Sequence, residues 1–198
     1  MPSTNQPYIR ITTGNFFTTL DPAARNPIGC VYVPPVAATL ATTTKGYGAQ
    51  PVVKYVYYNS TTNPAPVAAP APVYYTDESF TTVSGNAAEA YSTTGNVSIA
   101  GYWMPNSTAL SGLTAAQLNQ SYGFMQIGGL LVGAYAPTTA TGAGIGASIV
   151  GLATGNWASS TVAAGTAPTG RVFGVQYTAI ASAACDVLVS GLTTYWGS

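Results

Sequence analysis

The chain has 198 residues, enough for one medium-sized domain with or without an extended arm. Only 5% of its residues are charged, against about 25% in ordinary globular proteins, and its formal net charge is zero. Five scattered Lys and Arg residues cannot form a surface that follows a phosphate backbone, so we expect no nucleic-acid partner. A disordered chain is excluded by the 47% of hydrophobic residues, and no apolar run approaches the roughly 20 residues of a membrane helix.

The first 28 residues are predicted to form an extended arm. Prolines interrupt this segment at positions 2, 7, 22 and 27. Between them lie a β-prone stretch, residues 8–12, and the aromatic pair Phe16 and Phe17. Such an arm can dock on a neighbouring molecule or fold back on its own domain, and both interpretations stay open. Because no basic segment precedes an apolar one, we expect no signal peptide.

Residues 29–198 are predicted to form a single β-rich domain. A first strand at 29–33 ends at Pro34, and a second covers 52–58. Alternation in the second strand puts Val53, Tyr55 and Tyr57 on one side. The other side carries Val52, Lys54, Val56 and Tyr58. Residues 59–72 contain four prolines, which oppose a helix or a central strand, so we predict an exposed loop there.

The middle of the chain contains short strands and one short helix. Strands are predicted near 73–75, 80–83 and 97–104, with a turn at 84–86 and a bulge at Gly101. The helix begins after Thr114, because Thr114 and Gln117 have the spacing of a capping box.

Residues 122–135, YGFMQIGGLLVGAY, predict a β-hairpin. Gly128 and Gly129 would form its two-residue turn, since both turn positions can take positive φ. In this register one face is wholly apolar and is expected to point into a core. That face carries Gly123, Met125, Ile127, Leu130, Val132 and Ala134. On the opposite face Tyr122 and Tyr135 would lie across from each other.

The C-terminal third is predicted to contain further strands. The glycine-rich segment 138–151 lacks the helix and the acidic residue of a dinucleotide-binding loop, and is interpreted as a β-connection. A strand at 147–153 and a closing hairpin, 171–180 with 186–192, follow. The complete pattern predicts an all-β fold, an antiparallel sandwich or barrel of about 9–11 strands with at most one short helix.

The residues that usually carry catalysis are scarce. Without histidine there is no Ser-His-Asp triad, Cys-His pair or imidazole zinc site. Asp77 and Glu78 are adjacent, so in a strand they would point to opposite faces. Cys30 and Cys185 are predicted to be free thiols. We therefore predict a protein that is not an enzyme and has no cofactor or metal.

Three motifs together resemble small head-decoration and related head proteins of tailed bacteriophages. The first is a V-x-Y-V segment, residues 53–56. The second is the Y-G-x-x-Q-x-G pattern of residues 122–128. The third is a closing pair in which residues 174–179 precede the D-x-L-V pattern of residues 186–189. The resemblance covers about residues 29–192, and the arm and the Pro/Ala loop depart from it.

The resemblance implies a capsid decoration, or cement, protein on the exterior of the virion. Such a protein binds the major capsid protein as a homotrimer and stabilises contacts between capsomers. The residues expected to contact the capsid or neighbouring copies are Tyr8, Arg10, Phe16, Phe17, Tyr57 and Tyr58. Alternative hypotheses are a tail-tube, head-fibre or other virion protein, and a bacterial surface β-domain.

Overall fold

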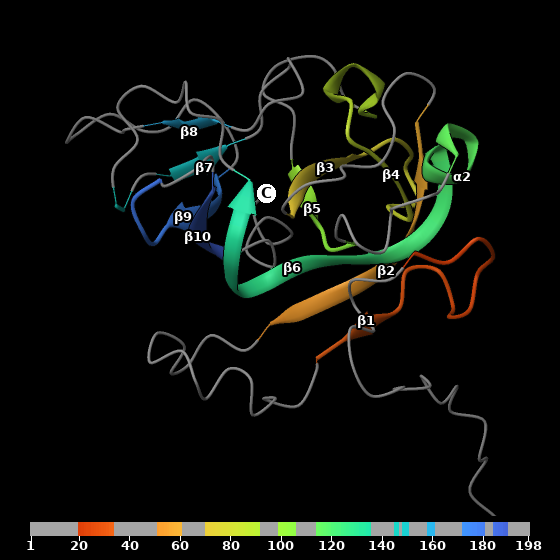
Figure 1. Cartoon of the computed structure of the whole chain (residues 1–198), viewed down its shortest axis with the longest axis horizontal. Helices are drawn as coiled ribbons and strands as arrows, with labels where there is room; N and C mark the ends of the chain where they lie inside the picture. The colour runs from red at the N-terminus through yellow and green to blue at the C-terminus, as the bar shows by residue number, and fades with distance from the viewer. Residues whose placement is uncertain are drawn as a thin grey trace, which may run out of the picture.

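The computed structural model shows an all-β fold, as predicted (Figure 1). The structure describes residues 20–33, 51–60, 70–91, 99–105, 114–135, 145–146, 148–150, 158–160, 172–180 and 184–189. Within these ranges it contains ten strands, one short α-helix and one turn of 3-10 helix. The strands are β1 (Val31–Tyr32), β2 (Val52–Asn59), β3 (Ala71–Tyr75), β4 (Thr82–Ser84), β5 (Ile99–Trp103), β6 (Gln120–Tyr135), β7 (Ser148–Val150), β8 (Ala158–Ser160), β9 (Val172–Gln176) and β10 (Ala184–Val189). The helices are η2 (Ala87–Glu89) and α2 (Ala115–Asn119).

Five strands close into a barrel. Their order is β2-β4-β3-β5-β6, and β6 returns to pair with β2. The seam between β2 and β6 is antiparallel and extends from the pair Val52–Gly128 to the pair Asn59–Gln120. The pairing of β2 with β4 is parallel, so the barrel departs from the wholly antiparallel sheet that the sequence predicted. In Figure 1, α2 precedes β6 at one end of the barrel.

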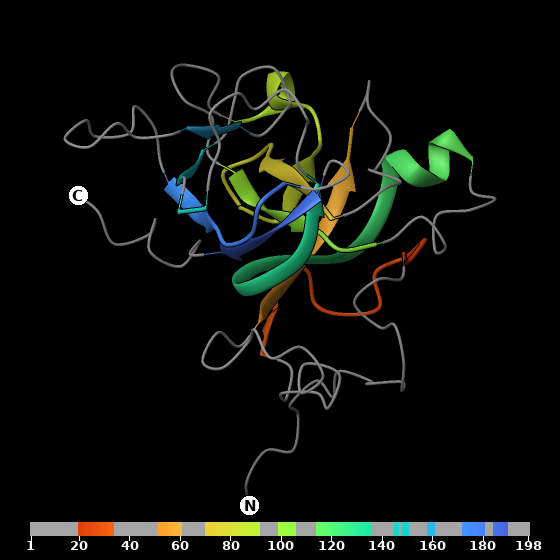
Figure 2. The ribbon, with the colours of Figure 1, turned by 60° about the vertical axis from the view of Figure 1, so that its left-hand side comes forward.

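The predicted hairpin at residues 122–135 is wrong. The segment forms one continuous strand, β6, which bends sharply as it leaves the barrel (Figure 2). Gly129 takes a positive φ of 81°, as expected for a turn glycine, but the chain continues in the same strand. The two halves do not pair with each other because each has a different partner. Residues up to Gly128 pair with β2, whereas residues from Gly129 to Tyr135 pair with β10.

The second half of β6 joins a smaller sheet beside the barrel. Its order is β6-β10-β9-β7-β8. The hairpin of β9 and β10 is confirmed, with Leu188 opposite Val175. A glycine is required at position 174, because a Cβ there would lie 2.5 Å from the backbone oxygen of Leu188. The one long strand therefore belongs to both parts of the fold.

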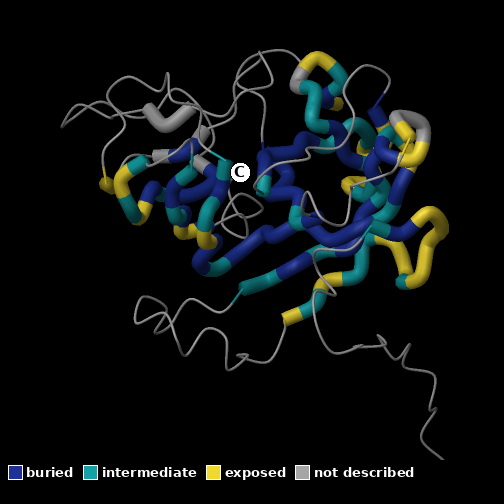
Figure 3. The backbone as a smooth tube through the Cα atoms, in the orientation of Figure 1, coloured by how far each residue is buried: buried dark blue, intermediate teal, exposed yellow. Residues whose placement is uncertain are grey.

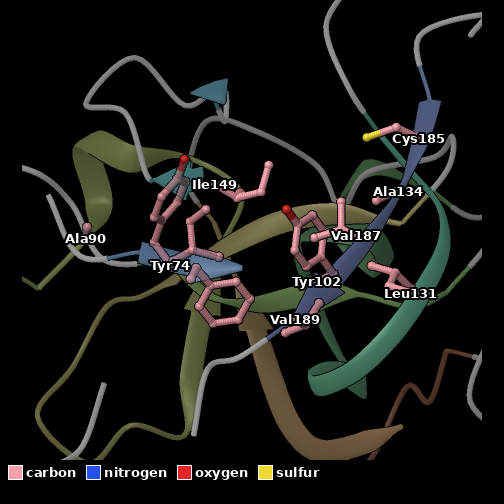
Figure 4. Packing of buried hydrophobic residues seen from close by; sticks show 11 residues of the cluster. Tyr74, Ala90, Tyr102, Leu131, Ala134, Ile149, Cys185, Val187 and Val189 are labelled. Carbon is pink, nitrogen blue, oxygen red and sulfur yellow. The ribbon is translucent and has the colours of Figure 1, made fainter. Parts of the chain in front are cut away.

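Three buried clusters hold these parts together. The barrel interior contains large aromatic and aliphatic side chains, among them Tyr58, Trp103 and Met125, all fully buried. A second cluster fills the space between the barrel wall and the smaller sheet (Figure 4), where Tyr74 and Tyr102 face Leu131, Val187 and Val189. A third, smaller cluster of Val53, Tyr55 and Phe124 lies on the outer side of β2 and β6. Burial is nearly continuous along the barrel half of β6, whereas buried and half-buried residues are interspersed along β2 (Figure 3).

Several local predictions can now be compared with the structure. The capping box is confirmed, because the backbone N–H of Thr114 donates to Gln117 Oε1 at 2.9 Å and the N–H of Gln117 donates to Thr114 Oγ1 at 3.3 Å. Val132 was predicted to be core, but it lies at a bulge opposite Asp186 and is 53% exposed. Of the predicted loop 59–72, Asn59 belongs to β2 and Ala71 and Pro72 belong to β3, whereas residues 61–69 lie outside the described residues. Proline is tolerated there because Pro72 pairs with β5 only.

Candidate interaction surface

The candidate surface begins where residues 20–33 cross the outer side of the barrel and end in β1. Asp21 and Tyr122 exchange two backbone hydrogen bonds of 2.8 Å, which attach this segment to β6. Further along, the N–H of Gly29 donates to the carbonyl of Tyr55 at 2.7 Å. Gly29 has a φ of 86°, which turns the chain into β1. The described part of the predicted arm, residues 20–28, therefore lies against the barrel, and residues 1–19 lie outside the described residues.

A buried carboxylate anchors this segment. Asp21 is only 7% exposed, and its Oδ2 accepts a 2.8 Å hydrogen bond from the hydroxyl of Tyr55. Its Oδ1 lies 3.1 Å from Nε of Arg25. Burial, together with the hydrogen bond to Asp21, raises the pKa of Tyr55 well above its usual value, so this hydroxyl stays a donor. We call the group formed by Asp21, Arg25 and Tyr55 the Asp21 anchor.

Removing the donor of the Asp21 anchor should loosen the segment. Tyr55→Phe leaves the buried carboxylate of Asp21 with one partner fewer, which costs about 1–3 kcal/mol. We expect trypsin to cleave after Arg25 several times faster in this variant than in the parent chain. Tyr57→Phe, two positions along the same strand, is the matched control and should leave the cleavage rate unchanged. Equal rates for the two variants would show that the hydrogen bond does not hold the segment.

The most exposed apolar residues of this region lie at β1. Val31 is 53% exposed, Val33 is 49% exposed and Ile28, just before the strand, is 44% exposed. β1 is the last strand of the sheet and pairs only with β2 among the strands that the structure describes (Figure 1). No charged residue occurs between positions 28 and 33. This combination is unusual, because natural sheets commonly protect an edge strand with charged side chains.

Of the six residues predicted as contacts, the structure describes only Tyr57 and Tyr58. Tyr8, Arg10, Phe16 and Phe17 lie outside the described residues. Tyr57 is half-buried on the outer side of β2, with its ring centroid 4.8 Å from that of Tyr122.

Tyr58 requires a correction. Its ring is fully buried inside the barrel, 5.2 Å from the ring of Trp103, and its hydroxyl accepts the N–H of Gly85 at 3.1 Å. The alternation of β2 sends Tyr58 to the interior, because it shares a side with Val56. Tyr58 is therefore a core residue and does not reach a neighbouring molecule.

A second polar group lies at the turn between β3 and β4. Lys54 Nζ donates to the carbonyl of Phe80 at 2.6 Å and to the hydroxyl of Tyr75 at 3.2 Å. Phe80 has a φ of 55°, an unfavourable conformation for a non-glycine residue, and the lysine bond holds its carbonyl in place. Burial lowers the pKa of Lys54, and the nearby Asp77 partly opposes this shift. Because its donors are used in fixing the turn, we assign Lys54 a structural role.

The described residues offer few groups for metal binding or thiol chemistry. No group of three or more His, Cys, Asp or Glu side chains that could hold a metal ion occurs in this part of the chain. Cys30 and Cys185 are both free, as predicted. Within the same residues, no helix is long and apolar enough to cross a membrane. The β1 edge and the Asp21 anchor were not predicted as site features, although the uncharged stretch between Pro27 and Pro34 was visible in the sequence.

Comparisons with known proteins identify no relative of this chain. No family model, no curated protein and no solved structure matches this chain. The functional argument therefore rests on the residues of the chain itself.

Proposed function

We propose that this chain is a non-enzymatic structural protein of a virion, of the decoration type that covers a phage head. In this role it binds the major capsid protein from outside, assembles as a homotrimer and stabilises contacts between capsomers. The observation that supports the proposal best is the β1 edge, where Val31 and Val33 are about half exposed and no charged side chain intervenes. An open, apolar, uncharged edge is suited to permanent contact with other protein.

The composition supports the same conclusion. Contacts between charged surfaces require ions to lose water, which costs free energy unless every ion finds a partner. A chain with ten charged residues among 198 can bury most of its surface against other protein without this cost. Many identical weak contacts, repeated over a closed shell, add up to strong attachment.

The arm provides a second set of contacts in this proposal. Residues 1–19 carry Tyr8, Arg10, Phe16 and Phe17 and lead directly into Leu20, which packs against the barrel interior cluster. The Asp21 anchor holds the residues that directly follow this segment against the barrel.

A deletion tests the contribution of the arm. Removal of residues 1–19 should reduce the number of copies on the particle while leaving the melting temperature of the free protein unchanged. The deletion stops before Leu20 because loss of that side chain would disturb the core. Phe16→Ser with Phe17→Ser is a milder variant with the same expected direction. Full occupancy of particles by the deleted chain would exclude the arm as a contact.

The location of the chain is the most direct test of the function. Intact phage particles labelled with a gold-conjugated antibody against this chain should carry gold over the whole head. Gold confined to the tail would replace the proposal with a tail protein. Particles without gold would favour a surface domain of the bacterium.

A further inference from the structure

We propose that the open edge of β1 pairs with β1 of a second copy of this chain, antiparallel and around a two-fold axis at Tyr32. The inference depends on the proposed function only for the setting in which the contact is used. Because a two-fold contact cannot close a trimer, it names a contact between copies of neighbouring trimers. It follows from the direction of the backbone groups, the exposed side chains and the local absence of charge.

The backbone of β1 presents bonding groups to the open side. The carbonyl of Cys30 accepts the N–H of Tyr55 at 2.9 Å, so this group points towards β2. In an antiparallel ladder, successive residues point their N–H and C=O groups to opposite sides. Val31, the next residue, therefore points its groups away from β2. Val33 lies directly after β1, and in the proposed pair it extends the strand and repeats the direction of Val31. These two residues define the edge that a second chain can use.

With a two-fold axis at Tyr32, the outward N–H and C=O groups of Val31 and Val33 all find partners in the second copy. Val31 of one copy then lies opposite Val33 of the other, and the reverse pair follows by symmetry. Each pair exchanges two hydrogen bonds, so the contact contains four. The valine side chains, half exposed in one copy, cover each other across the new seam. Tyr32 of the two copies forms the central, non-hydrogen-bonded pair on the opposite face, beside Cys30 and the outer cluster of each barrel.

The local sequence favours a second copy as the occupant. Two identical edges are self-complementary in this arrangement, and the zero net charge of the chain gives no long-range repulsion between copies. No charged side chain lies between Ile28 and Val33 to oppose pairing. In this register Cys30 of one copy lies opposite Pro34 of the other, so the pairing is confined to residues 31–33 of each copy and forms a closed pair. A contact this short buries less than the roughly 1,200 Å² of a standard interface, which suits a contact that is repeated over a shell.

Disulfide crosslinking tests the predicted register. In a non-hydrogen-bonded antiparallel pair the Cα atoms are about 4.5 Å apart, which a disulfide can span. The purified full-length variant Tyr32→Cys with Cys30→Ala is oxidised at several concentrations and examined on a non-reducing denaturing gel. Cys185 can remain, because burial raises the pKa of its thiol to about 11 and keeps it unreactive. A covalent dimer should form at least tenfold faster than in Val132→Cys with Cys30→Ala, although Val132 is 53% exposed and Tyr32 is only partly exposed.

Two further experiments can each support or overturn the proposal. Addition of Val31→Lys to the Tyr32→Cys variant should reduce the crosslinking rate to that of the Val132→Cys control. If Tyr32→Cys does not fold, an equal mixture of Val31→Cys and Val33→Cys chains, both without Cys30, replaces it. The mixture should form the mixed disulfide several times faster than either chain alone forms its own. Equal rates at positions 32 and 132, or equal rates for the mixture and for the single chains, would overturn the proposal. The crosslinking rates are measured without phage particles, so they test the β1 pairing separately from the proposed function. Either the crosslinking or the gold labelling can give a negative result while the other gives a positive one.

Discussion

Trp103→Ala is expected to lower the free energy of unfolding by about 3–5 kcal/mol, a large part of the roughly 5–15 kcal/mol of a typical domain. Trp103 is fully buried in the barrel interior, where its ring contacts Tyr58 at a centroid distance of 5.2 Å. The ring also fills the space beside Gly123, where an added Cβ would lie 2.9 Å from it. Its removal therefore empties the centre of the barrel at the seam of β5 and β6.

Urea denaturation followed by circular dichroism measures this change. Tyr177→Ala is the surface control, because Tyr177 is 46% exposed, and it should change the unfolding energy by less than about 0.5 kcal/mol. Trp103→Phe should cost less than Trp103→Ala, since it keeps most of the ring and removes a buried Nε1–H that has no acceptor among the described residues. A loss below 1 kcal/mol in Trp103→Ala would show that the barrel interior does not depend on this ring.

Sequence patterns predicted those parts of the fold that depend on local chemistry. The alternation of β2 placed Tyr55 and Tyr58 on opposite sides, and the structure puts them in two different clusters. The spacing of Thr114 and Gln117 predicted the start of α2 because a capping box is formed by residues three positions apart. In these cases the decisive interactions are made within one strand or one turn.

The wrong predictions concern long-range pairing. Gly128 and Gly129 have the sequence of a tight turn, and nothing local distinguishes such a turn from a bend in a continuous strand. The choice is made by β2 and β10, which lie far away in the sequence and give each half of β6 a full set of partners. The exposure of Val132 also results from long-range pairing, because it follows from a bulge opposite Asp186 in the pairing of β6 with β10.

The candidate surface was predictable only in part. Tyr57 and Tyr58 were both predicted as contacts. Which of the two is buried depends on which side of β2 faces the closed barrel. The Asp21 anchor joins residues 34 positions apart, so its formation depends on how the segment crosses the barrel. The open edge of β1 becomes a candidate only when the strand order shows that β1 is the last strand.

The buried tyrosines make the fold sensitive to alkali. Burial raises the pKa of Tyr58 from 10.0 to about 12, and it also raises the pKa of Tyr102, which is fully buried between the barrel and the smaller sheet. The folded state therefore keeps these hydroxyls protonated at pH values where the unfolded chain releases their protons. The contribution of these two tyrosines to stability is complete below about pH 10 and decreases as the pH rises towards 12, because the folded state then binds more protons than the unfolded state. Burial raises the pKa of the Cys185 thiol to about 11, which adds a loss in the same direction above about pH 9.

The expected effect is large. A shift of two pKa units corresponds to about 3 kcal/mol for Tyr58 alone, at about 1.4 kcal/mol per unit. Urea denaturation at half-unit steps from pH 8 to pH 12 should show a constant unfolding energy up to about pH 9 and a steep fall above pH 10. Tyr58→Phe should begin from a lower value, because it loses the hydrogen bond from Gly85, and should then fall less steeply. An unfolding energy that stays constant to pH 12 would mean that these hydroxyls reach solvent in the folded protein, contrary to the closed barrel.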